Sequence, residues 1–220
     1  MKTYLATANV GEIRWAAGNG LCDGVLTTPG LLHEERVAGD GHERLAEIAR
    51  ETGLPILATV GSVRGDDIHR DGRALARISD QVVVQVPFVE DAVVAMRKLS
   101  SEGIRVAATL VFNAAQAVLA AKSGASTVSV HVDQLDAQGH EGVEEVREIR
   151  MVFDRHGIEC DVLAAFPRNA SQFTGCALAG ADAQALSPAT LRALLLHPLT
   201  DRGIDQLLTD LSRRRPRARR

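Results

Sequence analysis

A histidine and an aspartate near position 130 are the side chains best suited to acid/base chemistry in this sequence. From position 127 to 133, valines occupy the even positions and polar residues the odd ones: Thr127, Ser129, His131 and Asp133. Successive side chains of a strand point to opposite faces, so the polar set shares one face. A histidine near its ordinary pKa serves as general acid or base at neutral pH, and a nearby carboxylate orients it. We therefore predict His131 and Asp133 as a catalytic pair.

Two other interpretations of the same residues are open. His131 can instead be a buried structural histidine, with its hydrogen bonds satisfied by Asp133 or by the backbone. A metal ion held by His131, Asp133, Asp136 and His140 is chemically reasonable, because imidazole and carboxylate suit several divalent ions. The spacing of these residues matches no strong metal signature, so we predict no metal site and no cofactor.

The candidate histidine belongs to one of eight short apolar runs that alternate with helical patterns. These runs recur at roughly 20–33 residues, the length of one βα unit. The predicted strands are Tyr4–Ala8, Gly24–Thr28, Ile56–Val60, Val82–Val86, Val106–Val111, Thr127–Val132, Asp161–Ala165 and Ala183–Leu186. Eight such units without a linker predict an α/β fold of one domain, a single (β/α)8 TIM barrel. The mouth at the carboxyl ends of the strands is where barrel enzymes carry their chemistry.

An additional helix is expected after the eighth unit. Its apolar stripe, at helical spacing, consists of Ile204, Leu207, Leu208 and Leu211. A helix this short must pack on something, either this barrel or a neighbouring subunit. We assign residues 1–212 to the barrel and its C-terminal helix. Residues 213–220 contain six arginines and are expected to form a disordered, solvated tail, with a basic arm as the alternative.

The composition is that of an ordinary soluble globular protein, with 45% hydrophobic and 24% charged residues. A formal net charge of −3 argues against nucleic-acid binding. Three cysteines, Cys22, Cys160 and Cys176, show no CxxC pairing and point to a reducing compartment. The sequence shows no signal peptide and no apolar run long enough to cross a membrane. We expect a cytoplasmic protein without a membrane partner.

Several segments resemble the small transaldolase and fructose-6-phosphate aldolase family. Residues 4–10 read YLATANV where the family reads YLDTANV, and residues 23–29 read DGVLTTP where it reads DGVTTNP. Residues 84–87 read VQVP where it reads VKVP or VKIP, and TLVF at 109–112, Gln116 and HPLTD at 197–201 also match in order and spacing. The resemblance covers residues 1–212. It implies a transaldolase-type barrel, often assembled as a pentamer or decamer in which the C-terminal helix reaches a neighbour.

The resemblance also implies that much of the family's catalytic apparatus is replaced. Members cleave or transfer a dihydroxyacetone unit through a lysine Schiff base, and that lysine falls on Gln85. The family's aspartate falls on Ala6, its asparagine on Thr28 and its Glu or Gln on Thr59. Its arginine falls on Gln134 and its serine on Phe166. The matching positions are Thr27, Thr109, Gln116 and Arg168. In part of the family a tyrosine at the position of His131 helps to move protons through a water.

The lysines of the chain support this interpretation independently. There are three: Lys2 precedes the first strand, and Lys98 and Lys122 lie on outer helices by their periodicity. A Schiff base needs a partly desolvated amine at the substrate carbonyl, and none of the three is expected to reach the mouth. Gln85 either hydrogen-bonds a ligand carbonyl or hydroxyl, or fills the space as a neutral group.

The remaining candidates describe a substrate pocket. Arg168, after the seventh strand, is the cation that we place at the mouth, where it can hold a carboxylate or one phosphate edge. Phe166 in place of a hydroxyl disfavours a full phosphate cradle, so an unphosphorylated or partly apolar ligand is expected. The predicted substrate-binding residues are Thr27, Thr28, Thr59, Thr109, Gln134, Phe166 and Arg168.

These features favour a divergent family member repurposed for acid/base chemistry without an imine. Its reaction would be of lyase, isomerase or cyclisation type, on a small carbonyl or polyhydroxy compound. His131 would be the acid/base, Asp133 its orienting partner, Gln85 a polar positioner beside Thr109, and Arg168 the anion anchor. The alternatives are a catalytically inactive barrel that acts as a ligand-binding or oligomeric partner protein, and a residual carbohydrate aldolase. Fold and ancestry alone do not fix the reaction.

Overall fold

The strands lie where the apolar runs predict them. The computed structural model describes residues 1–36 and 41–214. Its strands are β1 (Lys2–Ala6), β2 (Gly24–Thr27), β3 (Ile56–Thr59), β4 (Val82–Pro87), β5 (Val106–Val111), β6 (Thr127–His131), β7 (Asp161–Ala165) and β8 (Ala183–Leu186). Short runs of valine, alanine, leucine and isoleucine suit strands that are buried on both faces. All eight predicted strands are confirmed.

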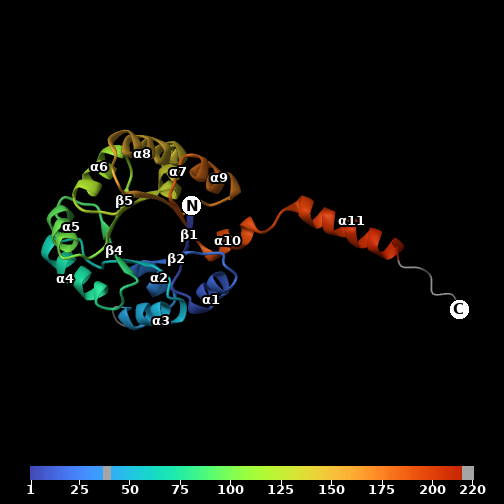
Figure 1. Ribbon diagram of the computed structural model, residues 1–220, viewed down its shortest axis with the longest axis horizontal. Coiled ribbons are helices and arrows are strands. Elements are labelled where there is room, and N and C mark those ends of the chain that lie inside the picture. The colour runs from blue at the N-terminus through green and yellow to red at the C-terminus, as the bar shows by residue number, and fades with distance from the viewer. Residues whose placement is uncertain (37–40, 215–220) are drawn as a thin grey trace.

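The strands close into one ring. Each pairs in parallel with its neighbours in chain order, and β8 closes the ring on β1. Figure 1 shows this ring with the helices arranged around its outside. The predicted single (β/α)8 barrel is therefore confirmed, and the carboxyl ends of all eight strands meet at one mouth.

Helices follow the strands, and all except the last lie around the outside of the ring (Figure 1). They are α1 (Val10–Gly18), α2 (Pro29–Glu34), α3 (His42–Thr52), α4 (Gly65–Ala76), α5 (Ala92–Ser101), α6 (Ala114–Lys122), α7 (Val132–Ala137), α8 (Gly142–His156), α9 (Ala170–Leu178), α10 (Pro188–Leu194) and α11 (Pro198–Arg214). Asn9, Asn113 and Asn169 cap α1, α6 and α9 by accepting a backbone N–H three residues on. These caps fix where the chain turns from strand to helix at the mouth.

The apolar residues form two cores. The larger core lies between strands and helices and contains the outward-facing valines and isoleucines, such as Val84, Val128 and Val130. The smaller core fills the lumen with Tyr4, Ala6, Leu26, Leu57, Val83, Ala107, Leu163, Ala165, Ala183 and Ala185. The period-two alternation on β6 is therefore confirmed: its valines face the helices, and Ser129 and His131 face the lumen.

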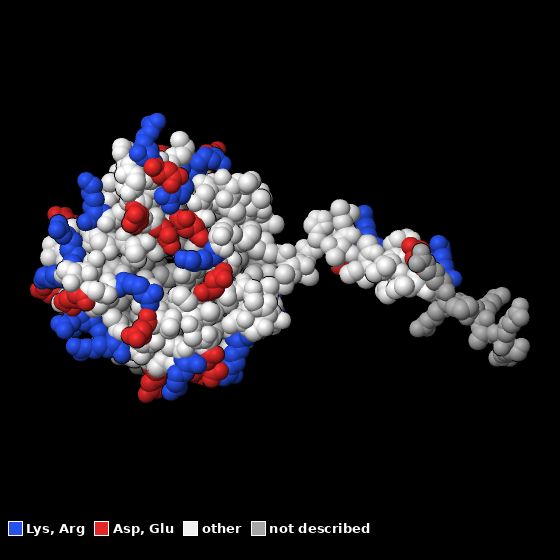
Figure 2. Space-filling model, viewed as in Figure 1, with Lys and Arg blue, Asp and Glu red and all other residues white. Residues whose placement is uncertain are grey.

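The last helix, α11, leaves the barrel and extends away from it (Figure 1). The side chains of residues 198–213 are exposed, including Leu199, Ile204, Leu207, Leu208 and Leu211. The extra C-terminal helix is confirmed, and it runs to Arg214. The rest of the predicted tail, residues 215–220, lies outside the described residues. Figure 2 shows both signs of charge interspersed around the outer helices of the face in view.

The three cysteines are buried and unpaired. Burial raises the pKa of the Cys160 thiol to about 12 and that of the Cys176 thiol to about 11, so both stay protonated at neutral pH. None of the helices in the described part of the chain has the length and apolar character needed to span a membrane.

Candidate active site

His131 lies at the carboxyl end of β6 with its ring inside the barrel mouth. It is 8% exposed, and both ring nitrogens have partners. Thr109 Oγ1 lies 3.0 Å from Nε2, and the Gln134 side-chain amide lies 3.2 Å from Nδ1. The rings of Phe112 and Phe166 flank the imidazole, with centroids 6.1 Å and 5.6 Å away. These contacts together hold the imidazole in one orientation.

The surroundings of His131 keep it neutral at pH 7. Burial lowers the pKa of its imidazole below the ordinary 6.5, and the negative charge of Asp133 opposes part of this shift. A neutral imidazole carries one proton, which can reside on either nitrogen. An amide can turn its oxygen or its nitrogen toward Nδ1, so Gln134 is compatible with both tautomers. His131 can therefore either give or take a proton through the Thr109 hydroxyl.

The predicted contact between Asp133 and His131 is not among the hydrogen bonds of the ring; Thr109 and Gln134 take both positions. The reason is local: β6 ends at His131 and α7 begins at Val132, so the strand alternation stops before Asp133. The carboxylate turns instead toward Arg168, with Oδ2 3.7 Å from Nη2. Asp133 acts on the histidine only through its charge.

Two residues beside His131 have left-handed backbone conformations, which non-glycine residues rarely adopt. Leu110 in β5 has φ 57°, where the β5–β6 register shifts between Ala108 and Val111. Phe166, directly after β7, has φ 60°. Each costs about 1–2 kcal/mol relative to ordinary backbone. Bulges and backbone strain of this kind are commonly found at functional sites.

Gln85 is another buried polar group of the lumen. It faces inward like Val83 on the same strand and is 1% exposed. Its Oε1 accepts a 2.7 Å hydrogen bond from the hydroxyl of Thr59, which also lies 3.2 Å from the carbonyl oxygen of Thr27. Its amide nitrogen has no hydrogen-bond partner among the described residues.

The other predicted substrate residues are spread more widely. The Thr28 hydroxyl caps α2 by accepting the N–H of Leu31 at 3.2 Å, which holds it at the start of that helix. The Arg168 side chain is 61% exposed and paired with Asp133. The structure therefore brings together the group His131, Thr109, Gln134 and Phe166, joins Gln85 to Thr59, and leaves Thr28 and Arg168 at the edge.

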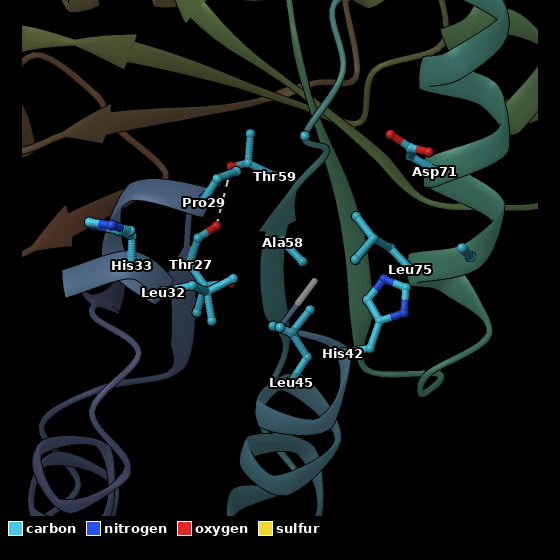
Figure 3. A pocket seen from close by; sticks show the side chains of 13 residues that line it. Thr27, Pro29, Leu32, His33, His42, Leu45, Ala58, Thr59, Asp71 and Leu75 are labelled. Carbon is cyan, nitrogen blue, oxygen red and sulfur yellow. Dashed lines mark hydrogen bonds between the residues drawn. The ribbon is translucent and has the colours of Figure 1, made fainter. Parts of the chain in front are cut away.

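A cavity of about 420 Å³ is bordered by β2, β3 and helices α2, α3 and α4, and neither His131 nor Thr109 lines it (Figure 3). Thr27 and Thr59 line it from the strand side, and the dashed line in Figure 3 marks the contact between them. Leu45 and Leu75 supply apolar walls. Thr59 thus borders two spaces, since its hydroxyl also reaches Gln85 inside the lumen.

The described residues offer no evident metal site: no group of three or more His, Cys, Asp or Glu side chains converges there. Asp136, one of the residues considered for a metal, instead accepts the N–H of Gly142 at 2.8 Å and the side-chain amide of Gln172. These bonds give Asp136 a structural role in positioning α8 and α9.

Comparison with known proteins identifies the family of the chain. Residues 5–216 match the model of the Transaldolase/Fructose-6-phosphate aldolase family. The chain belongs to this family. It is 40% identical over 210 residues to a probable transaldolase of Bacillus cereus, covering 96% of this chain and 97% of that protein. A probable transaldolase of Hyphomonas neptunium is 40% identical over 213 residues, covering 96% of each chain.

Solved structures share the fold at much lower identity. The structure titled "Native KDPGal structure" aligns with a TM-score of 0.59 and 15% identity, covering 84% of this chain and 80% of that one. A designed cube-shaped protein cage aligns with a TM-score of 0.63 and 13% identity, covering 96% of this chain and 76% of that one. At this identity the likeness extends to the barrel architecture alone.

The lysines of this transaldolase-family chain lie away from the mouth. All three are among the described residues. Lys2 begins β1 and lies 3.5 Å from Asp161 at the start of β7. Lys98 and Lys122 stand in the last turns of α5 and α6. Because these helices run back from the mouth, all three amines belong to the amino-terminal end of the barrel.

Ser129 is a lumen residue that the sequence did not mark as a site residue. It is fully buried, and its hydroxyl has no hydrogen-bond partner among the described residues. The alternation that points His131 inward also points Ser129 inward, so the direction of its side chain was readable. The sequence does not predict that the hydroxyl lacks a partner, because this depends on which residues the neighbouring strands place opposite it.

Proposed function

We propose that this protein catalyses proton transfer on a small carbonyl or polyhydroxy compound without forming a covalent imine. His131 is the acid/base, working through the Thr109 hydroxyl, and Gln134 orients the imidazole. The reaction class is that of a lyase, isomerase or cyclisation catalyst. The observation that carries this proposal is a neutral, buried histidine with both nitrogens bonded at the mouth of the barrel.

The placement of the lysines supports a mechanism without an imine. Gln85 stands where the family resemblance puts the Schiff-base lysine, and a side-chain amide is no nucleophile. The amines of Lys2, Lys98 and Lys122 lie at the opposite end of the barrel. An imine would need one of them at the substrate carbonyl.

The charges around the mouth favour an unphosphorylated ligand. Asp133 neutralises Arg168, and the ion pairs of the described residues place no second cation beside them. Phe166 brings an aromatic ring, rather than a hydroxyl, next to His131. One compensated guanidinium is a weak anchor for a dianionic phosphate. Arg168→Ala should therefore change binding of neutral polyols little, and a large loss of sugar-phosphate binding would contradict this ligand class.

A borohydride trap tests for an imine directly. The protein is incubated with dihydroxyacetone or fructose 6-phosphate, reduced with borohydride and weighed by mass spectrometry. We expect no added mass, whereas a Schiff-base aldolase would keep the reduced substrate. A covalent adduct would overturn the proposal and establish the residual-aldolase alternative.

A thermal-shift screen tests the site itself. Wild type, His131→Ala and the matched control His156→Ala, an exposed histidine of α8, are compared against sugars, sugar phosphates, keto acids and polyols. A ligand that binds only the folded state raises the melting temperature once its concentration exceeds Kd. We expect one class to stabilise wild type and the control but not His131→Ala. No shift for any compound would favour the inactive-barrel alternative.

The exposed leucines of α11 favour a homo-oligomer as well. A helix of 17 residues that buries none of its described side chains gains little stability by itself. We propose that its apolar face packs on a second copy of this chain, in a pentamer or decamer as the family resemblance implies.

Light scattering should give a multiple of 23.5 kDa for wild type and for the control Asp205→Ala. Leu207→Glu with Leu211→Glu should yield the monomer mass; an unchanged mass would exclude this interface.

A further inference from the structure

The cavity bordered by β2, β3 and helices α2, α3 and α4 lies against the outer side of the barrel wall. Val25 and Ala58 belong to the core between strands and helices, so their side chains face outward. Thr27 follows Val25 by two residues on β2 and shares this outward face, and both Thr27 and Ala58 line the cavity. None of the residues grouped around His131 is among its described lining. The cavity is therefore a second space, separate from the candidate active site.

The inner walls of this cavity are apolar. Figure 3 shows Leu32, Leu45 and Leu75, which come from α2, α3 and α4 and line the same space. Leu45 and Leu75 are buried, and Leu32 is half-buried. A volume of about 420 Å³ falls within the range of small-molecule pockets, which are mostly apolar with a few polar groups. Such walls suit a ligand with a compact hydrocarbon body.

The rim of the cavity is open to solvent. Gly61, which lines it directly after β3, is exposed, and a Cβ atom at this position would meet no other atom within 4 Å. Thr59, Asp71 and Ala74 are lining residues that are only half-buried. A small molecule can therefore enter from solvent without unfolding any element.

Asp71 is the one carboxylate among the described lining residues of the cavity. Its Oδ2 accepts a hydrogen bond from the Ser62 hydroxyl, which fixes the side chain against the loop after β3. Its Oδ1 lies 3.5 Å from Nη2 of Arg70, but the Arg70 side chain is 70% exposed and pairs more closely with Asp67, at 2.8 Å. A guanidinium shared in this way, and surrounded by water, compensates the charge of Asp71 only weakly.

We propose that this cavity binds a small primary amine with a compact apolar body, whose ammonium group pairs with Asp71. The hydrocarbon body packs between Leu45 and Leu75. An ammonium has three N–H donors, and its hydrogen bonds to a carboxylate are about twice as strong as those between neutral groups. This binding site goes beyond the proposed function, because it needs neither His131 nor any chemical step.

The same arrangement disfavours other ligands of equal size. A carboxylate ligand would bring a second negative charge beside Asp71, and like charges repel at this distance. A neutral alcohol would keep the apolar contacts but lose the charge-assisted hydrogen bond. The cavity should therefore rank three ligands of one shape by their charge, with the amine first and the carboxylate last.

Isothermal titration calorimetry with a matched ligand set provides the test. The ligands are cyclohexylmethylamine, cyclohexylmethanol and cyclohexanecarboxylate, measured at about pH 8, where a primary ammonium is charged and an ordinary imidazole is not. Wild type is compared with Asp71→Asn, which keeps an acceptor for Ser62, and with Ala74→Leu, which fills part of the cavity. The matched control is Asp67→Asn, because both aspartates stand on α4 and contact Arg70, but only Asp71 lines the cavity.

We expect wild type and Asp67→Asn to bind the amine about ten-fold more tightly than the alcohol, and to show no binding of the carboxylate. Asp71→Asn should bind amine and alcohol equally, and Ala74→Leu should weaken both. His131→Ala should bind the amine as wild type does.

Several outcomes would overturn this site. Wild-type affinity for the amine in Asp71→Asn or Ala74→Leu would show that the amine does not occupy the cavity. A loss in Asp67→Asn would place it on the outer acidic surface of α4, and a loss in His131→Ala would place it at the mouth. Absence of amine binding to wild type would exclude the site altogether. All of these results leave the proposed proton transfer untouched, since that function is tested by the borohydride trap and the ligand screen.

Discussion

The two ends of the barrel lumen differ in how well their residues satisfy one another. Toward the amino-terminal end, Tyr4, Leu57, Ala107 and Leu163 form an apolar lower layer that is part of the lumen core. Toward the mouth, Gln85 and Ser129 keep polar atoms without partners among the described residues, and Leu110 and Phe166 adopt left-handed backbone. The lower layer stabilises the fold. The unpartnered polar atoms and the strained residues toward the mouth lower the stability of the protein, as is common in regions shaped for function.

This contrast makes opposite predictions for substitutions at the two ends. Those at the mouth should change activity more than stability, and those in the lower layer should do the reverse.

Replacement of His131 should have the largest effect. His131→Ala removes the acid/base group, which commonly contributes a factor of about 10²–10⁴ in rate. Exchange of the C–H hydrogens of dihydroxyacetone for deuterium in D2O, measured by NMR, should fall by that factor while the melting temperature stays close to that of wild type. If the variant unfolds, or exchanges hydrogens at the wild-type rate, the claim that His131 serves activity and not stability is contradicted.

Leu163→Ala should act on stability alone. The side chain is fully buried in the lower layer, and truncating a buried leucine to alanine costs about 2–5 kcal/mol. Urea unfolding should show this loss in the free energy of unfolding. Exchange activity per folded molecule should match wild type, and a parallel loss of activity would mean that the two ends of the lumen are coupled.

Ser129→Ala should stabilise the protein, in contrast to Leu163→Ala. It removes a buried hydroxyl that has no partner among the described residues, so the free energy of unfolding should rise by about 1 kcal/mol. Ser123→Ala removes a buried hydroxyl that has a partner and should lower it. Urea unfolding of the two variants provides a matched comparison. A lower free energy of unfolding for Ser129→Ala would show that its hydroxyl is already satisfied in the free protein.

The pH dependence of stability should show a smaller effect from His131. Burial lowers the pKa of the folded-state imidazole below 6.5, and the charge of Asp133 offsets part of this. Between the folded and unfolded pKa values the unfolded chain binds more protons, so stability rises with pH there. The free energy of unfolding of wild type minus that of His131→Gln should therefore fall as pH drops below 6.5 and then level off. A difference that grows toward acid pH would contradict a buried neutral histidine.

The fold was readable because its signals are local. Each strand is a short run of branched aliphatic residues, and the alternation on β6 gave the correct inward face for Ser129 and His131. The asparagines that cap α1, α6 and α9 mark the turns from strand to helix. One barrel with an extra helix follows from eight such units and the apolar stripe of α11.

The sequence predicts which residues belong to the candidate site but not which contacts they make. Asp133 was expected beside His131 because the alternation was continued two residues past the end of β6. The bulge at Leu110 and the missing partner of Ser129 arise from how neighbouring strands pair. Such features depend on register around a closed ring, which no single stretch of sequence contains. Gln134 reaches the imidazole from α7 for the same reason.

The position of the three lysines has a practical consequence. Since all of them lie at the amino-terminal end of the barrel, an amine-reactive surface or dye would attach there. The protein would then be held by the end that carries no candidate chemistry, with the mouth turned toward solution. Immobilised in this way, it can be screened against soluble compounds without blocking His131.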